Sequence, residues 1–185
     1  MEKQMKISTK TVVSVGMFTA VLAVLSILKI PMPSGVPITL QTFAMALCGY
    51  VLGAKKGTSS TIIYILVGAV GVPVFAGMTG GVSCLFGYTG GFLWGFIFLT
   101  LLCGISLNVK NKAIQVILGI AGLAVCHLLG TIWYAVVAST TIWGSFLLVS
   151  VPYLVKDVIS VVGAYFIAIA LRKALNAANL LPAEA

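Results

Sequence analysis

Acidic side chains are almost absent from this sequence, and charged residues of either sign are scarce. Of its 185 residues, 8% are charged, three are Asp or Glu and one is His, whereas 61% are hydrophobic. A soluble domain has about a quarter of its residues charged because its surface must face water. The shortage of charge therefore excludes an ordinary soluble domain. Several apolar stretches follow one another, which indicates an all-α integral membrane protein.

Other scarcities exclude several classes of function. The four cysteines, at positions 48, 84, 103 and 126, form no C-x-x-C pair, so packing is a better explanation for them than metal binding or disulfides. The phosphate-loop pattern G-x-x-x-x-G-K-[ST] does not occur. Histidines and acids are too few to assemble a metal site or an acid–base centre. We therefore predict that the chain is not an enzyme and carries no metal or cofactor of its own.

The net charge of +8 does not indicate a nucleic-acid partner, because the basic residues form no dense patch. Nine of the eleven lie in small groups between apolar stretches, at positions 3, 6 and 10, at 55 and 56, at 110 and 112, and at 172 and 173. Lysine and arginine at the cytoplasmic ends of membrane helices have this distribution. The two exceptions are Lys29 and Lys156.

Six transmembrane helices are predicted, over residues 11–28, 38–52, 58–72, 89–107, 113–137 and 152–173. The first apolar run is longer than that of a signal peptide, and no A-x-A site follows it, so it is interpreted as a helix. With a cytoplasmic N-terminus, the nine grouped basic residues all lie inside, as the charge bias of membrane proteins requires. We predict a single domain over residues 1–185 in the plasma membrane, in contact with lipid, with cytoplasmic tails 1–10 and 174–185.

Two irregular loops predict a cavity on the outer side. Residues 29–37 contain three prolines and residues 73–88 are rich in glycine, whereas residues 138–151 are predicted to lie along the outer surface. Irregular backbone at membrane depth is tolerated where it is buried in protein or lines a cavity. The pattern G-x-T-G-G occurs at 77–81 and again at 87–91. These glycines either let the backbone approach a ligand closely, or form tight turns and close helix contacts through Gly91 and Gly95.

Asp157 is the only acidic residue between Glu2 and Glu184, and it falls inside the last predicted helix. An ionisable residue within a membrane helix is costly and is therefore a functional candidate. It can be a ligand acceptor, a partner in a structural ion pair, or part of a proton relay. Self-pairing with Lys156 is disfavoured because adjacent side chains diverge by about 100° around a helix. The single histidine, His127, is interpreted as a helix–helix hydrogen-bonding residue.

Three segments resemble the BioY family, the biotin-specific substrate-binding (S) components of energy-coupling factor (ECF) transporters. They are V-P-I-T-L-Q-T at 36–42, G-V-P-V-F-A-G at 71–77 and G-Y-T-G-G-F at 87–92. The family's last motif, P-[FY]-x-x-x-D-x-x-K, begins here at Pro152. Its aspartate matches Asp157, but Ser160 occupies the lysine position and Lys156 precedes the aspartate instead.

The resemblance implies a high-affinity biotin-capture subunit of an ATP-driven vitamin importer. Biotin has two ureido N–H donors, a carbonyl acceptor, an apolar body and a carboxylate. Asp157 is expected to accept from an N–H, and Lys156 to bind the carboxylate, with Lys29 as the second candidate. The other implied binding residues are Thr39, Gln41, Thr42, Phe75, Gly80, Tyr88, Thr89, Gly90, Gly91, Tyr153 and Ser160.

The resemblance also implies partner chains, namely a transmembrane coupling protein and a pair of ABC-type ATPases that hydrolyse ATP. The family contacts its coupling protein through small residues four apart in the first helix. Gly16 and Ala20, with Ala23 beside them, have that spacing here. An ion-coupled small-molecule carrier that acts alone stays open as the alternative.

Overall fold

The chain folds into helices joined by irregular loops and one short hairpin. The structure is a computed structural model and describes residues 8–178 and 180. The hairpin pairs strands β1 (Lys29–Ile30) and β2 (Ile38–Thr39) in antiparallel register, with Lys29 opposite Thr39. The helices are α1 (Thr9–Ile27), α2 (Gln41–Ala69), α3 (Val82–Phe86), α4 (Gly90–Ser106), α5 (Lys112–Val137), α6 (Ile142–Val149) and α7 (Val151–Ala177).

Among the described residues, α1, α5 and α7 are long and apolar enough to cross a membrane, and α4 is a shorter apolar helix. Apolar side chains face outward along these helices, including Val24, Ile117, Leu128 and Phe166. An exposed apolar helix surface suits contact with lipid rather than water. The helical fold and its apolar surface agree with the predicted all-α membrane protein.

The second and third predicted helices are one helix with a sharp break. Instead of a turn over residues 53–57, only Gly53 leaves the helical conformation, with φ 80° and ψ 176°, and α2 continues through Lys55 and Lys56. Glycine adopts a positive φ without the steric cost of a Cβ, and no proline prevents the helix from restarting at once. The Arg172 guanidinium donates to the carbonyl of Val51, just before the break, at 2.9 Å.

The loops contain more regular structure than predicted. Residues 38 and 39 pair as strand β2, and the helix begins at Gln41 rather than at Ile38. The glycine-rich loop includes the one-turn helix α3, and the stretch predicted as an irregular outer segment includes α6. Thr141 caps α6 by accepting from the N–H of Gly144 at 3.1 Å, a capping role that threonine commonly has.

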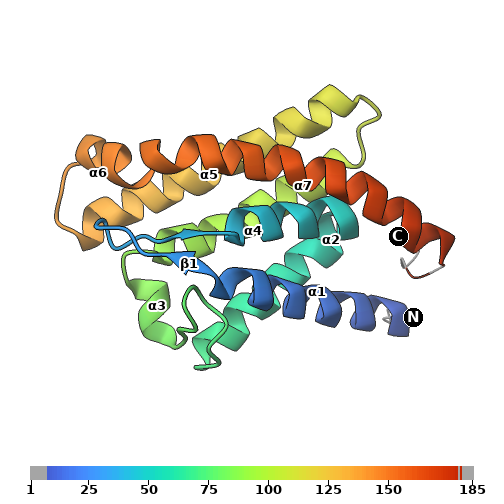
Figure 1. Cartoon of the computed structure of the whole chain (residues 1–185), viewed down its shortest axis with the longest axis horizontal. Helices are drawn as coiled ribbons and strands as arrows, with labels where there is room; N and C mark the ends of the chain where they lie inside the picture. Colours follow the sequence, from blue (N-terminus) through green and yellow to red (C-terminus); the bar gives the residue numbers. More distant parts are fainter. Residues whose placement is uncertain (1–7, 179, 181–185) are drawn as a thin grey trace, which may run out of the picture.

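The two ends of the molecule's long axis contain different parts of the chain (Figure 1). Both chain ends, the break in α2 and the α4–α5 turn lie at one end, which we call the terminal end. The hairpin, α3 and α6 lie at the other, which we call the loop end. The grouped basic residues of the described chain therefore lie toward the terminal end.

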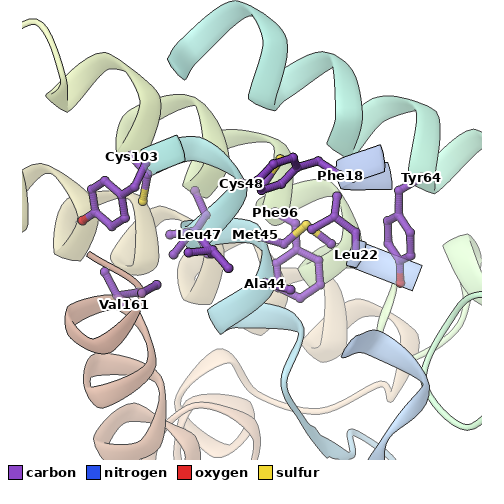
Figure 2. Packing of buried hydrophobic residues seen from close by; sticks show 14 of the residues in the cluster. Phe18, Leu22, Ala44, Met45, Leu47, Cys48, Tyr64, Phe96, Cys103 and Val161 are labelled. Carbon is purple, nitrogen blue, oxygen red and sulfur yellow. The ribbon is translucent and has the colours of Figure 1, made fainter. Parts of the chain in front are cut away.

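The first half of α2 is the centre of the core. Nearly every residue from Gln41 to Leu52 is buried, because α1, α4 and α7 all pack against this segment. Figure 2 shows Met45 and Cys48 of α2 beside Phe18 and Leu22 of α1, and Leu47 on the side of α2 that faces Val161 of α7. All four cysteines are free, and three of them are fully buried. Their packing positions agree with the interpretation of cysteine as a small apolar residue.

Candidate binding site

A cavity of about 230 Å³ lies at the loop end, between the hairpin, the 75–84 segment and helices α4, α5 and α7. It is somewhat smaller than the roughly 300–1,000 Å³ of pockets for drug-sized ligands. Apolar lining residues predominate, with a few polar groups among them. The cavity is lined by seven of the predicted binding residues, namely Thr39, Gln41, Thr42, Phe75, Thr89, Tyr153 and Asp157.

Asp157 enters the cavity from α7 and is 5% exposed. Its Oδ2 lies 3.2 Å from Nε2 of His127 on α5, so His127 forms the helix–helix hydrogen bond predicted for it. The Lys156 ammonium contacts Oδ1 as an ion pair, although no hydrogen bond of standard geometry reaches that oxygen from the described residues. Helical divergence was expected to disfavour this pair, but the flexible four-carbon stem of lysine bends back far enough.

The His127 ring is held from both sides. Its Nδ1 lies 3.0 Å from the hydroxyl of Ser150, which in turn lies 2.8 Å from the hydroxyl of Thr131. All four side chains of this Asp157–His127–Ser150–Thr131 network are buried. Buried polar groups that satisfy one another in this way rigidify their surroundings. The network therefore fixes the position of the Asp157 carboxylate at the cavity wall.

A second set of hydrogen bonds orders the part of the wall at the start of α2. The Thr39 hydroxyl donates to Gln41 Oε1 at 3.1 Å, and Gln41 Nε2 donates to the Tyr64 hydroxyl at 3.0 Å. That hydroxyl donates to the carbonyl of Val74 at 3.2 Å. The Tyr64 ring meets the buried Phe75 ring edge-on, with centroids 5.5 Å apart. Polar and aromatic groups of this wall are thus oriented before any ligand enters.

Two tyrosines hold the proline-rich loop over the cavity. The Tyr134 hydroxyl donates to the carbonyl of Ser34 at 2.9 Å. The Tyr153 hydroxyl donates to the carbonyl of Val36 and lies 3.1 Å from the Ser34 hydroxyl. Because its hydroxyl is engaged with the loop, Tyr153 presents mainly its ring to the cavity.

The two lysines outside the basic groups have different positions. Lys29, on β1, lines the cavity. The Lys156 ammonium lies outside the lining, where it pairs with Asp157 and donates to the carbonyl of Thr39 at 3.0 Å. Its side chain is 30% exposed.

The remaining predicted residues do not line the cavity. Tyr88 packs against Gly35 and against the Tyr134 ring, with ring centroids 5.5 Å apart. Gly90 and Gly91 lie against Leu85, Leu129 and Trp133, and Gly80 lies against the backbone of Gly71 and Val72. Ser160 is half-buried on α7. Of the two roles considered for the paired glycines, this geometry favours close packing.

Several lining residues were not singled out by the sequence, among them Thr79, Phe92, Leu123, Cys126 and Val149. Phe92 and Cys126 meet only because α4 packs on α5, and Val149 belongs to the unpredicted helix α6. Apolar residues at helical spacing give no local signal that tells a cavity wall from a lipid-facing surface.

A family model described as the BioY family matches residues 1–177. The chain belongs to the BioY family. The biotin transporter BioY of Thermotoga maritima is 38% identical over 168 residues, which cover 89% of this chain and 96% of that protein. The biotin transporter BioY2 of Lactococcus lactis subsp. cremoris is 34% identical over 176 residues, covering 94% and 95% of the two chains.

A solved structure has the same fold as this BioY-family chain. It is the crystal structure of the S-component for biotin from an ECF-type ABC transporter, with a TM-score of 0.82 and 26% sequence identity. The match covers 90% of this chain and 95% of that one. These relatives are components of transporters and not enzymes, and the family is a membrane family.

Proposed function

We propose that this chain captures biotin for an ATP-driven vitamin importer whose ATP hydrolysis takes place on separate chains. The observation that carries the proposal is the cavity lined by Asp157 in a chain of the BioY family. Relatives named as biotin transporters, and a structural match to an S-component for biotin, support the choice of ligand.

The chemistry of the cavity wall fits the fused-ring part of biotin. Asp157 accepts from a ureido N–H, while Thr39, Gln41, Thr42 and Thr89 supply further polar contacts. Phe75 and Tyr153 pack against the apolar body. A hydrogen bond to a charged group contributes about 1.5–3 kcal/mol net. An analogue that lacks a matched polar group leaves buried partners unpaired and is therefore rejected.

Six membrane spans with both termini in the cytoplasm form part of the same proposal. The break at Gly53 divides α2 into two shorter spans, which join α1, α4, α5 and α7. The basic groups at Lys55 and Lys56, at Lys110 and Lys112, and at Arg172 and Lys173 then share the cytoplasmic side with the N-terminus. The cavity opens on the outer side, at the loop end.

An exposed face of α1 supports contact with a transmembrane coupling protein, which works with a pair of ABC-type ATPases. Gly16 and Ala20 are exposed, and a Cβ added at Gly16 would meet no atom within 4 Å. Small residues four apart allow another helix to approach closely. Ala23 is only half-exposed and packs partly against the core, so it contributes less to this face.

The test is equilibrium binding of labelled biotin to the purified chain, with Asp157→Asn as the decisive variant. The amide keeps the shape but removes the charge and brings N–H donors. We expect affinity to fall at least tenfold, equivalent to about 1.4 kcal/mol, while the variant elutes and unfolds like the wild type. Wild-type affinity in Asp157→Asn would exclude the aspartate as the ligand acceptor, and no binding by the wild type would overturn the proposed function.

A further inference from the structure

The cavity lining contains two charged side chains, and they come from different elements. Lys29 belongs to β1, directly after α1, whereas Asp157 belongs to α7. A ligand that fills the cavity therefore meets both an acceptor and a cation.

The two charges differ in how they are compensated. Asp157 is the only acidic residue in the described part of the chain, and Lys156 already pairs with it. Lys29 consequently has no acidic partner among residues 8–178 and 180. Its side chain is exposed at the cavity mouth, where a cation keeps part of its hydration while it remains available to an anion. The cavity thus presents an excess positive charge at the Lys29 side.

The position of the Lys29 ammonium depends on Gly77. A Cβ placed on Gly77 would occupy the space of Cε and Nζ of Lys29, and Gly77 has a φ of 71°, which favours glycine. The N–H of Gly77 donates to the carbonyl of Ile27, at the end of α1, at 2.9 Å. The 75–79 segment is therefore fixed beside β1 and leaves room for the lysine to extend along the cavity rim.

We propose that Lys29, rather than Lys156, binds the carboxylate of the ligand. The inference rests on the proposed function, because it assigns the tail of biotin once Asp157 holds the ureido ring. Lys156 is committed to Asp157 and to the Thr39 carbonyl, and it lies outside the lining. Ser160, at the position where the family motif has lysine, is neutral and also lies outside the lining. Lys29 thus supplies from β1 the cation that α7 does not provide.

The experiment compares biotin with biotin amide, its uncharged analogue, in the purified wild type and in Lys29→Gln, Lys29→Met, Lys29→Arg, Lys156→Gln and Lys112→Gln. In the wild type we expect biotin to bind at least tenfold more tightly than the amide. Lys29→Gln and Lys29→Met should reduce that ratio to within threefold of unity, mainly by weakening biotin. Lys29→Arg should preserve most of the ratio, because it keeps the charge. Lys112→Gln, at the terminal end, should leave the ratio unchanged.

The ratio separates this inference from its alternatives. If both Lys29→Gln and Lys29→Met keep the wild-type ratio of biotin affinity to biotin-amide affinity, Lys29 does not bind the carboxylate. The same conclusion follows if these variants lose affinity for biotin and for the amide equally. A ratio that collapses in Lys156→Gln alone would assign the carboxylate to Lys156. If the wild type binds neither ligand, the proposed function fails before the role of Lys29 is reached.

Discussion

At the scale of single residues, Asp157 has the contacts of a structural group and also the position of a cavity-lining group. Its ion pair with Lys156 and its hydrogen bond with His127 are the contacts expected of a structural group. It nevertheless lines the cavity, together with His127. Removing one partner of a buried charge leaves the other uncompensated. The ion pair therefore compensates the charge of a carboxylate at this depth, as the proposed role of Asp157 as a ligand acceptor requires.

Ser150 supports the His127–Asp157 hydrogen bond from behind, and its contribution can be measured. Ser150→Ala removes the group that holds Nδ1 of His127, and it also deprives Thr131 of its partner. We expect biotin affinity to fall about threefold to tenfold, in line with the roughly 0.5–1.5 kcal/mol of a net hydrogen bond. Titration of the purified variant with labelled biotin measures the effect.

Ser145→Ala is the matched control, because Ser145 is equally buried but its hydroxyl has no hydrogen-bond partner in the described structure. It should bind biotin within twofold of the wild type. Equal losses in the two variants would mean that any cavity left by a serine hydroxyl near α6 disturbs the site. The positioning role of Ser150 would then be wrong.

Residue-level prediction from the sequence was possible where a residue is chemically unusual. Asp157 stands out because an acid is isolated among apolar residues, whereas Gln41 was named only through the family resemblance. The roles of Lys29 and Lys156 could not be separated in that way. Which ammonium faces the cavity depends on the pairing of β1 with β2 and on the space at Gly77, and both arise only in the folded chain.

At the scale of helices and loops, glycine determines how closely the helices approach. A Cβ on Gly95 would meet the backbone of Cys126, and one on Gly91 would meet the Leu129 carbonyl and the Trp133 side chain. These two glycines, four residues apart, place α4 directly on α5. The cavity wall made by Phe92, Cys126 and His127 depends on that contact, although neither glycine lines the cavity.

Helix boundaries were predictable where proline, glycine or lysine ends an apolar run. Helices predicted over 89–107, 113–137 and 152–173 correspond to α4 (Gly90–Ser106), α5 (Lys112–Val137) and α7 (Val151–Ala177). Helix α6 was missed because its eight residues are too few to span a membrane and include a glycine. Its helical state depends on the Thr141 cap and on packing against α5 and α7.

The exposed face of α1 leads to a prediction that separates binding from transport. Gly16→Trp or Ala20→Trp places a large ring where a partner helix would approach. We expect uptake of labelled biotin by cells to fall at least tenfold, while the purified variants bind biotin within twofold of the wild type. The physical reason is distance, because Gly16 lies in the first half of α1, which begins at the terminal end, whereas the cavity lies at the loop end (Figure 1).

Gly163→Trp on α7 is a suitable control, since a Cβ there also meets no atom within 4 Å. It should retain both uptake and binding. If the α1 variants lose binding together with uptake, partner contact and ligand recognition are not separate functions of this chain.

At the scale of the whole molecule, the distribution of charge along the long axis gives the chain an orientation. Lys10 lies at the start of α1, Lys55 follows the break in α2, Lys110 lies in the α4–α5 turn and Arg172 lies near the end of α7. All four are therefore toward the terminal end. Composition predicted this grouping, because basic residues at alternate connections must share a side if every intervening helix crosses the membrane. The break in α2 was less predictable, since the chain changes direction at the single residue Gly53 rather than over a five-residue turn.

The number of spans leads to the last prediction, which single-cysteine labelling can test. In cells that express variants with Cys84 replaced by alanine, the other three cysteines are buried and should stay unlabelled by an impermeant maleimide. Six spans with a cytoplasmic N-terminus require Thr140→Cys to react in intact cells. Lys10→Cys and Lys110→Cys should then react only after permeabilisation. If only α1, α5 and α7 crossed, with the N-terminus still inside, residue 110 would be outside and residue 140 inside. In a six-span chain of reversed orientation, residues 10 and 110 would both be outside and residue 140 inside. Labelling at these three positions therefore distinguishes all three topologies, and the cavity faces the outside only in the first.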